Sequence, residues 1–420
     1  MKQKERYMFR LFILVFLPLL LPGGFSCTNH QPGMQDSIKA MTVNIPEELP
    51  WSERMALSIM KRCPEAWMND FSEKPRWSYT HGLIMLSILK TWEATDKRIY
   101  LDYAKSYADT MILPDGTIRD YELDEFNIDH INPGKFLFTL YEETGQENYR
   151  KAIATLKRQL DWQPRNKDGG FWHKLKYPWQ MWLDGLYMGE PFYAEHAMRN
   201  NSTKEFDDIA HQFILMEEHA RDPQTGLLYH GWDQSRVQRW SDPETGLSRH
   251  FWGRAVGWYV MALVDVLDFF PENHPQREEL IAILNRALDA VAKVQDEETG
   301  LWHQVLDQGD REGNYLESTA SCMFTYAMIK GVNNRYLDEK YRAIAQKSYD
   351  GILRHFIAVD DTGEVELKMC CSVAGLGGKP YRDGSFDYYI NEPVRSNDPK
   401  GMGPFILASL EFEHTPAIKN

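Results

Sequence analysis

A single carboxylate, Asp184, stands among large apolar side chains and is the residue of this sequence best suited to proton transfer. Trp179, Met181 and Trp182 precede it, and a run of aliphatic and aromatic residues follows it. Loss of water around a carboxyl disfavours its charged form and raises its pKa. A carboxyl that keeps its proton near neutral pH is suited to general acid catalysis. The alternative is structural, with Asp184 as a helix cap and the aromatic residues in a core.

Other polar side chains occur where loops are predicted to meet helices. Asp129, in the segment N-I-D-H-I-N-P-G, is either a second active-site carboxylate or the cap of a helix that begins at about residue 133. His173 and Lys174 follow a predicted turn and are either site residues or ordinary surface residues. If they belong to a site, we expect Lys174 to place a cation near Asp184.

A basic residue and an aromatic residue share one predicted helical face further along the chain. Arg254 and Trp258 are four residues apart, which places them on the same side of a helix. An arginine on an otherwise apolar face needs a partner, and the carboxylate of a ligand is a natural one. His230 follows another turn, where it is either a site residue or bonded locally. A polar segment at 382–398 either borders the site or closes the fold.

Helices are predicted to position these residues. Apolar side chains recur at helical spacing, and no alternating run of comparable length predicts a strand. The clearest helical segments are 153–160, 206–216, 256–267, 320–328 and 349–356.

A turn recurs between the predicted helices, with a glycine followed by apolar, aromatic and often histidine residues. Its glycines are Gly116, Gly170, Gly226, Gly300 and Gly363, spaced 54, 56, 74 and 63 residues apart. Each interval accommodates two helices and a connection. A ring of helical hairpins builds one continuous core, so residues 46–420 need not divide. We therefore predict an all-α fold, an (α/α)6 toroid forming a single domain with its function on the loop face.

Composition excludes several classes of partner and cofactor. The net charge is −14, without a basic stripe, which argues against nucleic acid and requires local cations for any anionic ligand. The cysteines lack zinc-ligand spacing, the histidines are scattered singly, and the glycine cluster at 375–378 lacks the lysine of a phosphate loop. We predict no metal and no cofactor.

The N-terminus has the order of a secretory signal. Basic residues precede an apolar run at 11–21, and small residues lead to Cys27. The run is too short for a comfortable membrane span. Cys27 is the expected acylation site of a lipoprotein, although Gly24 stands where leucine is usual and plain cleavage is the alternative. We expect residues 1–27 to be a signal, residues 28–45 a polar tether, and the protein to be exported, periplasmic or anchored to the outer membrane of a Gram-negative-type bacterium.

The sequence from about residue 50 to 412 resembles glycoside hydrolase family 105, the unsaturated rhamnogalacturonyl hydrolases. Six motifs in the same order carry the resemblance. They are W-S-Y-T-H-G (77–82), N-I-D-H-I-N-P-G (127–134), W-Q-M-W-L-D-G-L-Y-M (179–188), Y-H-G-W-D (229–233), F-W-G-R-A-V-G-W (251–258), and the pair C-S-V-A-G-L-G-G (371–378) with E-P-V-R-S-N-D-P-K-G (392–401). The family has the six-hairpin fold and removes a 4,5-unsaturated uronic acid from lyase-generated pectin oligosaccharides.

The resemblance implies a mechanism and a set of roles. An acid protonates C4 of the vinyl ether, water adds at C5, and the hemiketal collapses; this differs from the displacement of ordinary glycosidases. Asp184 resembles the acid and base, and Asp129 the second active-site carboxylate, whose charge would raise the pKa of Asp184. The other implied substrate-contacting residues are Tyr79, His173, Lys174, Trp182, His230, Arg254 and Trp258. Gly231 differs from the larger residue of many relatives, which leaves the shape of the subsite open.

Two other functions compete with this interpretation. The related unsaturated glucuronyl hydrolases share the toroid and the hydration chemistry but use glycosaminoglycan fragments. A non-catalytic glycan-binding lipoprotein would keep the aromatic residues but would have no need of Asp184 together with Asp129. The two carboxylates and Arg254 favour an enzyme.

Overall fold

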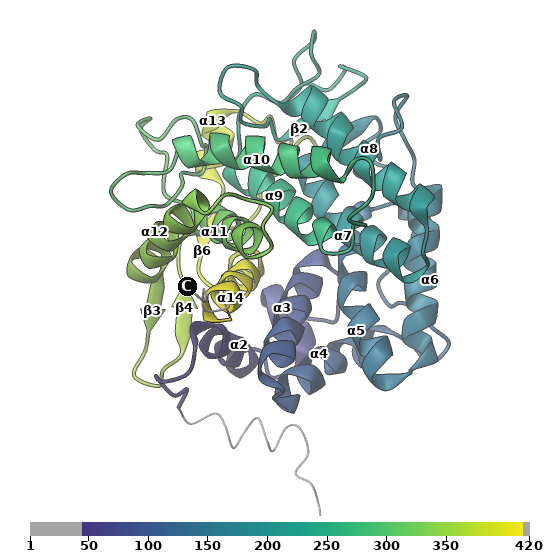
Figure 1. Ribbon diagram of the computed structural model, residues 1–420, viewed down its shortest axis with the longest axis vertical. Helices are drawn as coiled ribbons and strands as arrows, with labels where there is room; N and C mark the ends of the chain where they lie inside the picture. The colour runs from purple at the N-terminus through teal and green to yellow at the C-terminus, as the bar shows by residue number, and fades with distance from the viewer. Residues whose placement is uncertain (1–43, 415–420) are drawn as a thin grey trace, which may run out of the picture.

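The computed structural model describes residues 44–414 of the 420-residue chain. In this range, twelve helices of ten or more residues alternate between an inner and an outer ring (Figure 1). The inner helices are α3 (Tyr79–Thr95), α5 (Lys135–Thr144), α7 (Leu183–Arg199), α9 (Gly253–Leu267), α11 (Ser318–Asn333) and α14 (Pro399–Glu413). The outer helices are α2 (Trp51–Arg62), α4 (Arg98–Met111), α6 (Glu147–Trp162), α8 (Thr203–Ala220), α10 (Arg277–Lys293) and α12 (Lys340–His355).

The first and last helices close the ring. Helix α2 packs against α14, so the two ends of the described chain form the sixth hairpin (Figure 1). The predicted all-α (α/α)6 toroid is confirmed. None of the helices within 44–414 is long and apolar enough to cross a bilayer.

Burial explains which helices lie inside. Every residue of α9 is buried, as is nearly every residue of α11. The outer helix α6 instead buries one stripe that includes Tyr149, Ile153, Leu156 and Leu160 and leaves its other face in water. A helix that is apolar on all sides belongs in a core, and an amphipathic helix belongs on a surface.

The recurring turns are present, with one correction. Gly116, Gly226, Gly300 and Gly363 adopt φ angles between 75° and 93°, which glycine tolerates best. In the second copy the left-handed residue is Gly169, at 89°, rather than Gly170. Gly170 is required for space, because a β-carbon there would lie 2.2 Å from Met181 Sδ. An unpredicted copy at 242–247 lies inside the loop between α8 and α9.

Short elements connect the hairpins. Three antiparallel pairs of strands form: β1 (Gln180–Trp182) with β2 (Gly231–Asp233), β3 (Ile357–Val359) with β4 (Val365–Leu367), and β5 (Cys370–Cys371) with β6 (Val394–Arg395). The short helices are η1 (Ala66–Phe71), η2 (Leu123–Glu125), η3 (Ile128–His130), η4 (Asn132–Gly134) and α13 (Phe386–Asn391). These strands were not predicted, because two or three residues are too few to show an alternating pattern.

The N-terminal boundary differs slightly from the predicted one. Ile45 is buried and its N–H donates to the Thr362 carbonyl at 2.8 Å, so it belongs to the toroid rather than to a tether. The predicted signal at 1–27, the acylation site Cys27 and the tether up to residue 43 lie outside the described residues. The other four cysteines, Cys63, Cys322, Cys370 and Cys371, are free thiols.

Candidate active site

The predicted site residues gather at the mouth of the toroid where the inner helices begin. Tyr79 opens α3, Asp184 lies in the first turn of α7, and Arg254 lies in the first turn of α9. The inner helices run parallel, since the C-terminal portions of all six line a single cavity at the other end. Each helix N-terminus carries a partial positive charge. This mouth therefore favours an anionic ligand despite the negative net charge of the protein.

Asp184 is positioned by the pairing of β1 with β2. Trp182 pairs with Gly231, and the Leu183 N–H donates to the His230 carbonyl at 3.0 Å. The N-cap of α7 is Trp182, without a capping side chain, so Asp184 is not the helix cap. Its carboxylate is mostly buried, at 14 % exposure.

His230 lies beside this carboxylate and is completely buried. Its Nε2 lies 3.2 Å from Asp184 Oδ2, but the relative orientation is not that of a hydrogen bond, and neither atom has another hydrogen-bond partner. The other ring nitrogen, Nδ1, lies 2.8 Å from the hydroxyl of Tyr389. The ring of His230 is therefore fixed on one side and faces Asp184 on the other.

Asp129 is paired with basic groups. It lies in η3, whose N-cap is Asn127, and α5 begins at Lys135 rather than at 133. Lys174 Nζ binds Asp129 Oδ2, and His173 Nε2 lies 3.4 Å from Oδ1. Burial opposes the charge of Asp129, but Lys174 and His173 outweigh it and lower its pKa. The expectation that Lys174 places a cation near Asp184 stays a prediction; the structure shows that its ammonium binds Asp129.

His173 lies between the two carboxylates. Burial lowers its pKa to about 4, although the charges of both Asp129 and Asp184 act in the opposite direction. Its ring stacks on Trp182, with centroids 4.4 Å apart, and its Nδ1 has no hydrogen-bond partner. His173 is thus a neutral imidazole at pH 7 that holds Asp129 and Trp182 in place.

Trp182 is a wall of this site rather than an open platform. The side chain is 5 % exposed, and its ring stacks on Tyr177 as well as on His173. A β-carbon on Gly231 would lie 2.9 Å from Trp182 Cδ1 and 2.8 Å from Leu376 Cδ1. Glycine at 231 therefore allows the loop to lie directly against the tryptophan.

Arg254 has unused donors at the same mouth. It is buried; its Nη1 donates to the Cys371 carbonyl at 2.5 Å, and its Nε has no hydrogen-bond partner among the described residues. Trp258 is buried beside it on α9 and packs edge-on against Tyr79, which is only half-buried. Buried polar atoms in folded proteins are normally satisfied. The free Nε therefore indicates a place for an acceptor from a ligand.

Sequence reasoning missed several residues of the site. Three of them contact predicted site residues from segments distant in the chain. The Tyr389 hydroxyl contacts His230, the Cys371 carbonyl accepts from Arg254, and the Tyr177 ring stacks on Trp182. The position of the 382–398 segment beside the active-site mouth was left open by the sequence. No local spacing signals contacts that depend on closure of the ring.

Comparison with known proteins accounts for this architecture. The model of Glycosyl Hydrolase Family 88 matches residues 51–415. A solved glycoside hydrolase from family 105 of C. acetobutylicum ATCC 824 is 50 % identical with a TM-score of 0.84, covering 87 % of this chain and 99 % of that one.

The chain belongs to glycoside hydrolase family 105.

Two curated relatives extend this result. The protein Atu3128 of Agrobacterium fabrum is 38 % identical over 230 residues, 53 % of this chain and 97 % of its own. The unsaturated rhamnogalacturonyl hydrolase YesR of Bacillus subtilis is 28 % identical over 325 residues, 76 % of this chain and 86 % of its own. The resemblance found in the motifs is confirmed, and this family 105 member is a glycoside hydrolase.

Proposed function

We propose that this hydrolase removes a 4,5-unsaturated galacturonyl residue from the non-reducing end of lyase-generated rhamnogalacturonan fragments. The observation that carries the proposal is that Asp184 and a buried Arg254 both lie in the first turns of inner helices at one mouth of the toroid. A carboxyl for proton transfer and a desolvated cation for a carboxylate are what an unsaturated uronide requires. The similarity to YesR, whose name describes this activity, supports the pectin substrate.

Asp184 acts as the proton donor. Its carboxyl delivers a proton to C4 of the vinyl ether, and the carboxylate that remains takes a proton from water as the water adds at C5. One group can serve as acid and then as base within a cycle. The proton taken from water restores the Asp184 carboxyl. The hemiketal then collapses and releases the next sugar, and in this step the proton lost by the hydroxyl equals the proton gained by the leaving oxygen.

His230 and Tyr389 position this carboxyl. The bond from Tyr389 to His230 Nδ1 holds the ring, so that Nε2 remains 3.2 Å from Asp184 Oδ2. Asp129 acts indirectly, because it is bound to Lys174 and supports His173. Its charge is largely compensated by Lys174, so repulsion of Asp184 by Asp129 is no longer the expected role.

Arg254 holds the uronate carboxylate. Its Nε has no hydrogen-bond partner among residues 44–414, and the converging helix N-termini add positive potential. Trp258, Tyr79 and Trp182 shape the surface on which the sugar ring lies. Lys174 takes part only through Asp129.

The test is a substrate panel. Loss of the ultraviolet absorbance of the conjugated uronate is followed with two lyase-generated disaccharides, unsaturated galacturonyl-rhamnose and an unsaturated glucuronyl disaccharide from a glycosaminoglycan. We expect the first to be turned over with the higher kcat/KM. Preference for the second favours the glucuronyl alternative, and failure with both at high enzyme concentration contradicts the proposal. The exported location, with Cys27 as lipid anchor, is a further proposal tested by fractionation and intact mass.

A further inference from the structure

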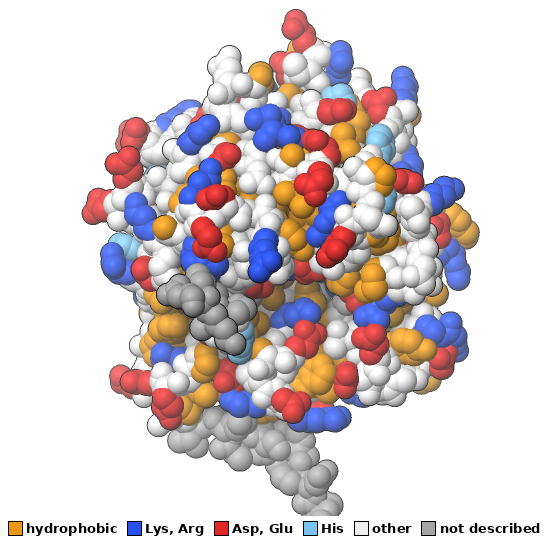
Figure 2. Space-filling model, viewed as in Figure 1, with side chains coloured by type: hydrophobic (Ala, Val, Ile, Leu, Met, Phe, Trp, Pro, Cys, Tyr) orange, Lys and Arg blue, Asp and Glu red, His pale blue; other side chains and the backbone are white. Residues whose placement is uncertain are grey.

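A second cavity lies at the opposite mouth of the toroid. Its volume is about 620 Å³, compared with about 10 Å³ for the crevice beside Trp182. All six inner helices contribute lining residues, mostly from their C-terminal halves. Figure 2 shows this end of the molecule, hollowed near its centre with acidic and basic side chains around the hollow. A cavity of this volume is in the range that holds small molecules.

Most charged groups of this cavity are bound to each other. Lys330 Nζ lies 2.7 Å from Asp265 and 2.6 Å from Asp268. Arg199 binds Glu195 at 2.6 Å and also binds Glu142. Lys90 and Glu93 form a pair at 2.7 Å, and Glu411 accepts from Asn333 at 2.9 Å.

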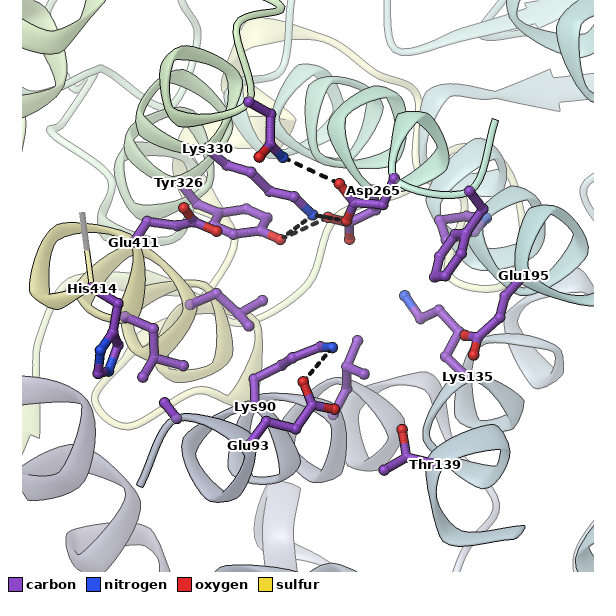
Figure 3. Close-up of a pocket in the computed structure, with 18 of the residues that line it drawn as sticks. Lys90, Glu93, Lys135, Thr139, Glu195, Asp265, Tyr326, Lys330, Glu411 and His414 are labelled. Carbon is purple, nitrogen blue, oxygen red and sulfur yellow. Dashed lines mark hydrogen bonds and ion pairs between the residues drawn. The ribbon is translucent and has the colours of Figure 1, made fainter. Parts of the chain in front are cut away.

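Lys135 is the exception among these charged groups. It is 4 % exposed, and its Nζ has no hydrogen-bond partner in the part of the chain that the structure describes. The ammonium position lies 3.5 Å from the centroid of the Tyr187 ring. Figure 3 shows Lys135 extending from α5 into the cavity, near Glu195 and opposite the pair of Lys330 and Asp265. Burial lowers the pKa of Lys135 to about 7, so at neutral pH about half of the amine is uncharged.

The surroundings restrict the ligand. Six carboxylates, four lysine and arginine side chains and His414 line the cavity, and six helix C-termini converge there, so an anion is disfavoured. A cation is disfavoured as well, because the unsatisfied group is itself an amine. What remains is a neutral ligand whose oxygen accepts from Lys135 and whose hydroxyls bond the neighbouring carboxylates.

We propose that this cavity binds a small neutral hydroxy-carbonyl compound, such as the open-chain form of a reducing sugar, as an imine on Lys135. The Nζ lone pair attacks the carbonyl carbon, and the carbonyl oxygen leaves as water after taking up two protons. The amine supplies both protons in net terms, so the products are the imine and one water. No oxidant or reductant is needed.

Two neighbours are placed to assist this reaction. Glu195 is close enough for its charge to raise the pKa of Lys135, and burial raises the pKa of Glu195 itself to about 7. Glu195 can therefore donate a proton to the departing hydroxyl near neutral pH. The face of Tyr187 stabilises the protonated imine as it does an ammonium.

The charged and titratable groups that face Lys135 come from every neighbouring inner helix. They are Glu142 on α5, Tyr187, Glu195 and Arg199 on α7, Asp265 on α9 with Asp268 just after it, Tyr326 and Lys330 on α11, Glu411 on α14 with His414 just after it, and Lys90 with Glu93 on α3. Because Lys330 remains bound to Asp265 and Asp268, it serves as a paired lysine in the same cavity.

The test traps the imine. The full chain is incubated at pH 7 with glyceraldehyde and cyanoborohydride, and adducts are mapped by peptide mass spectrometry. Lys204, which is exposed, and Lys90 and Lys330, which are paired, are internal comparators. At pH 7 the uncharged, reactive fraction of an amine with a pKa of about 7 is about 10³-fold larger than that of an ordinary lysine. Restricted access to the buried Lys135 offsets part of this gain. We expect Lys135 to be labelled at least about tenfold faster than Lys204. We also expect the rate of Lys135 labelling to level off as the glyceraldehyde concentration rises.

Three further measurements test the reactive amine, the ligand class and the labelled residue separately. The ratio of Lys135 to Lys204 labelling should fall as pH rises from 7 to 10, because an ordinary lysine gains reactive amine and Lys135 gains little. Butyraldehyde, which lacks hydroxyls, should label Lys135 more slowly than glyceraldehyde does. A Lys135→Met variant should lose the fast adduct. Labelling of Lys135 no faster than Lys204 overturns the proposal, and equal labelling by butyraldehyde overturns the ligand class. Because the adducts are mapped on the wild-type protein, this test does not depend on whether a variant folds.

Discussion

Lys174 Nζ binds Asp129 Oδ2 at the mouth where the inner helices begin. This ion pair joins a loop residue after α6 to the carboxylate of η3, 45 positions apart in the chain. Both side chains are mostly buried, at 16 % and 14 % exposure. The pair compensates the charge of the second carboxylate, and we propose Asp184, beside His230, as the group that transfers the proton.

Replacement of Lys174 by methionine should destabilise the fold at neutral pH. The variant leaves the mostly buried Asp129 carboxylate without its cation, at a cost of about 1–3 kcal/mol. Because the ion pair lowers the pKa of Asp129, the stability it provides is present above pH 4 and is lost as pH falls through the lowered pKa. Urea unfolding at pH 7 and at low pH checks this, with the exposed Lys204→Met as control. An equal deficit at every pH would show that Asp129 is not the partner that matters.

His173 should make the wild type sensitive to mild acid. Its pKa falls from an ordinary 6.5 to about 4 on folding. As the pH is lowered, His173 therefore takes up a proton in the unfolded chain at a higher pH than in the folded protein. Stability contributed by neutral His173 is complete above pH 6.5 and is lost as pH falls from there toward 4. Linkage gives about 3 kcal/mol over this interval. We expect His173→Asn to show a flatter profile of unfolding free energy between pH 7 and pH 4. Parallel profiles for the two proteins would exclude a buried neutral imidazole.

Arg254 should be needed for the carboxylate of the substrate. Arg254→Lys keeps the positive charge but loses the forked donors, including the unpartnered Nε. A desolvated charged hydrogen bond contributes about 1.5–3 kcal/mol, so kcat/KM on the unsaturated galacturonyl disaccharide should fall about 10- to 150-fold. Circular dichroism and thermal melting of the variant provide the folding control. Kinetics equal to the wild type would remove Arg254 from substrate binding.

Periodic features of the sequence predicted the toroid, whereas contacts between distant segments remained hidden. The apolar spacing in α8 and α9 and the left-handed glycines at 226 and 300 are local, so each reports directly on a helix or a turn. The partner of Lys174 is set by where the loop after α6 folds back onto η3, and no spacing within the loop encodes this. Tyr389 reaches His230 from 159 positions away for the same reason.

The central claim is that Asp184 carries the proton, and its amide variant tests it most directly. Asp184→Asn keeps the size of the side chain but cannot supply an acidic proton, so kcat should fall by about three or more decades, at or beyond the usual span for general acid catalysis. Asp129→Asn is the matched control, since it removes a carboxylate bound to Lys174 and should retain measurable activity. Both are assayed by loss of the conjugated uronate absorbance of an unsaturated galacturonyl disaccharide that the wild type hydrolyses. Near-normal turnover by Asp184→Asn would contradict the account and leave Asp184 as a structural residue in the first turn of α7.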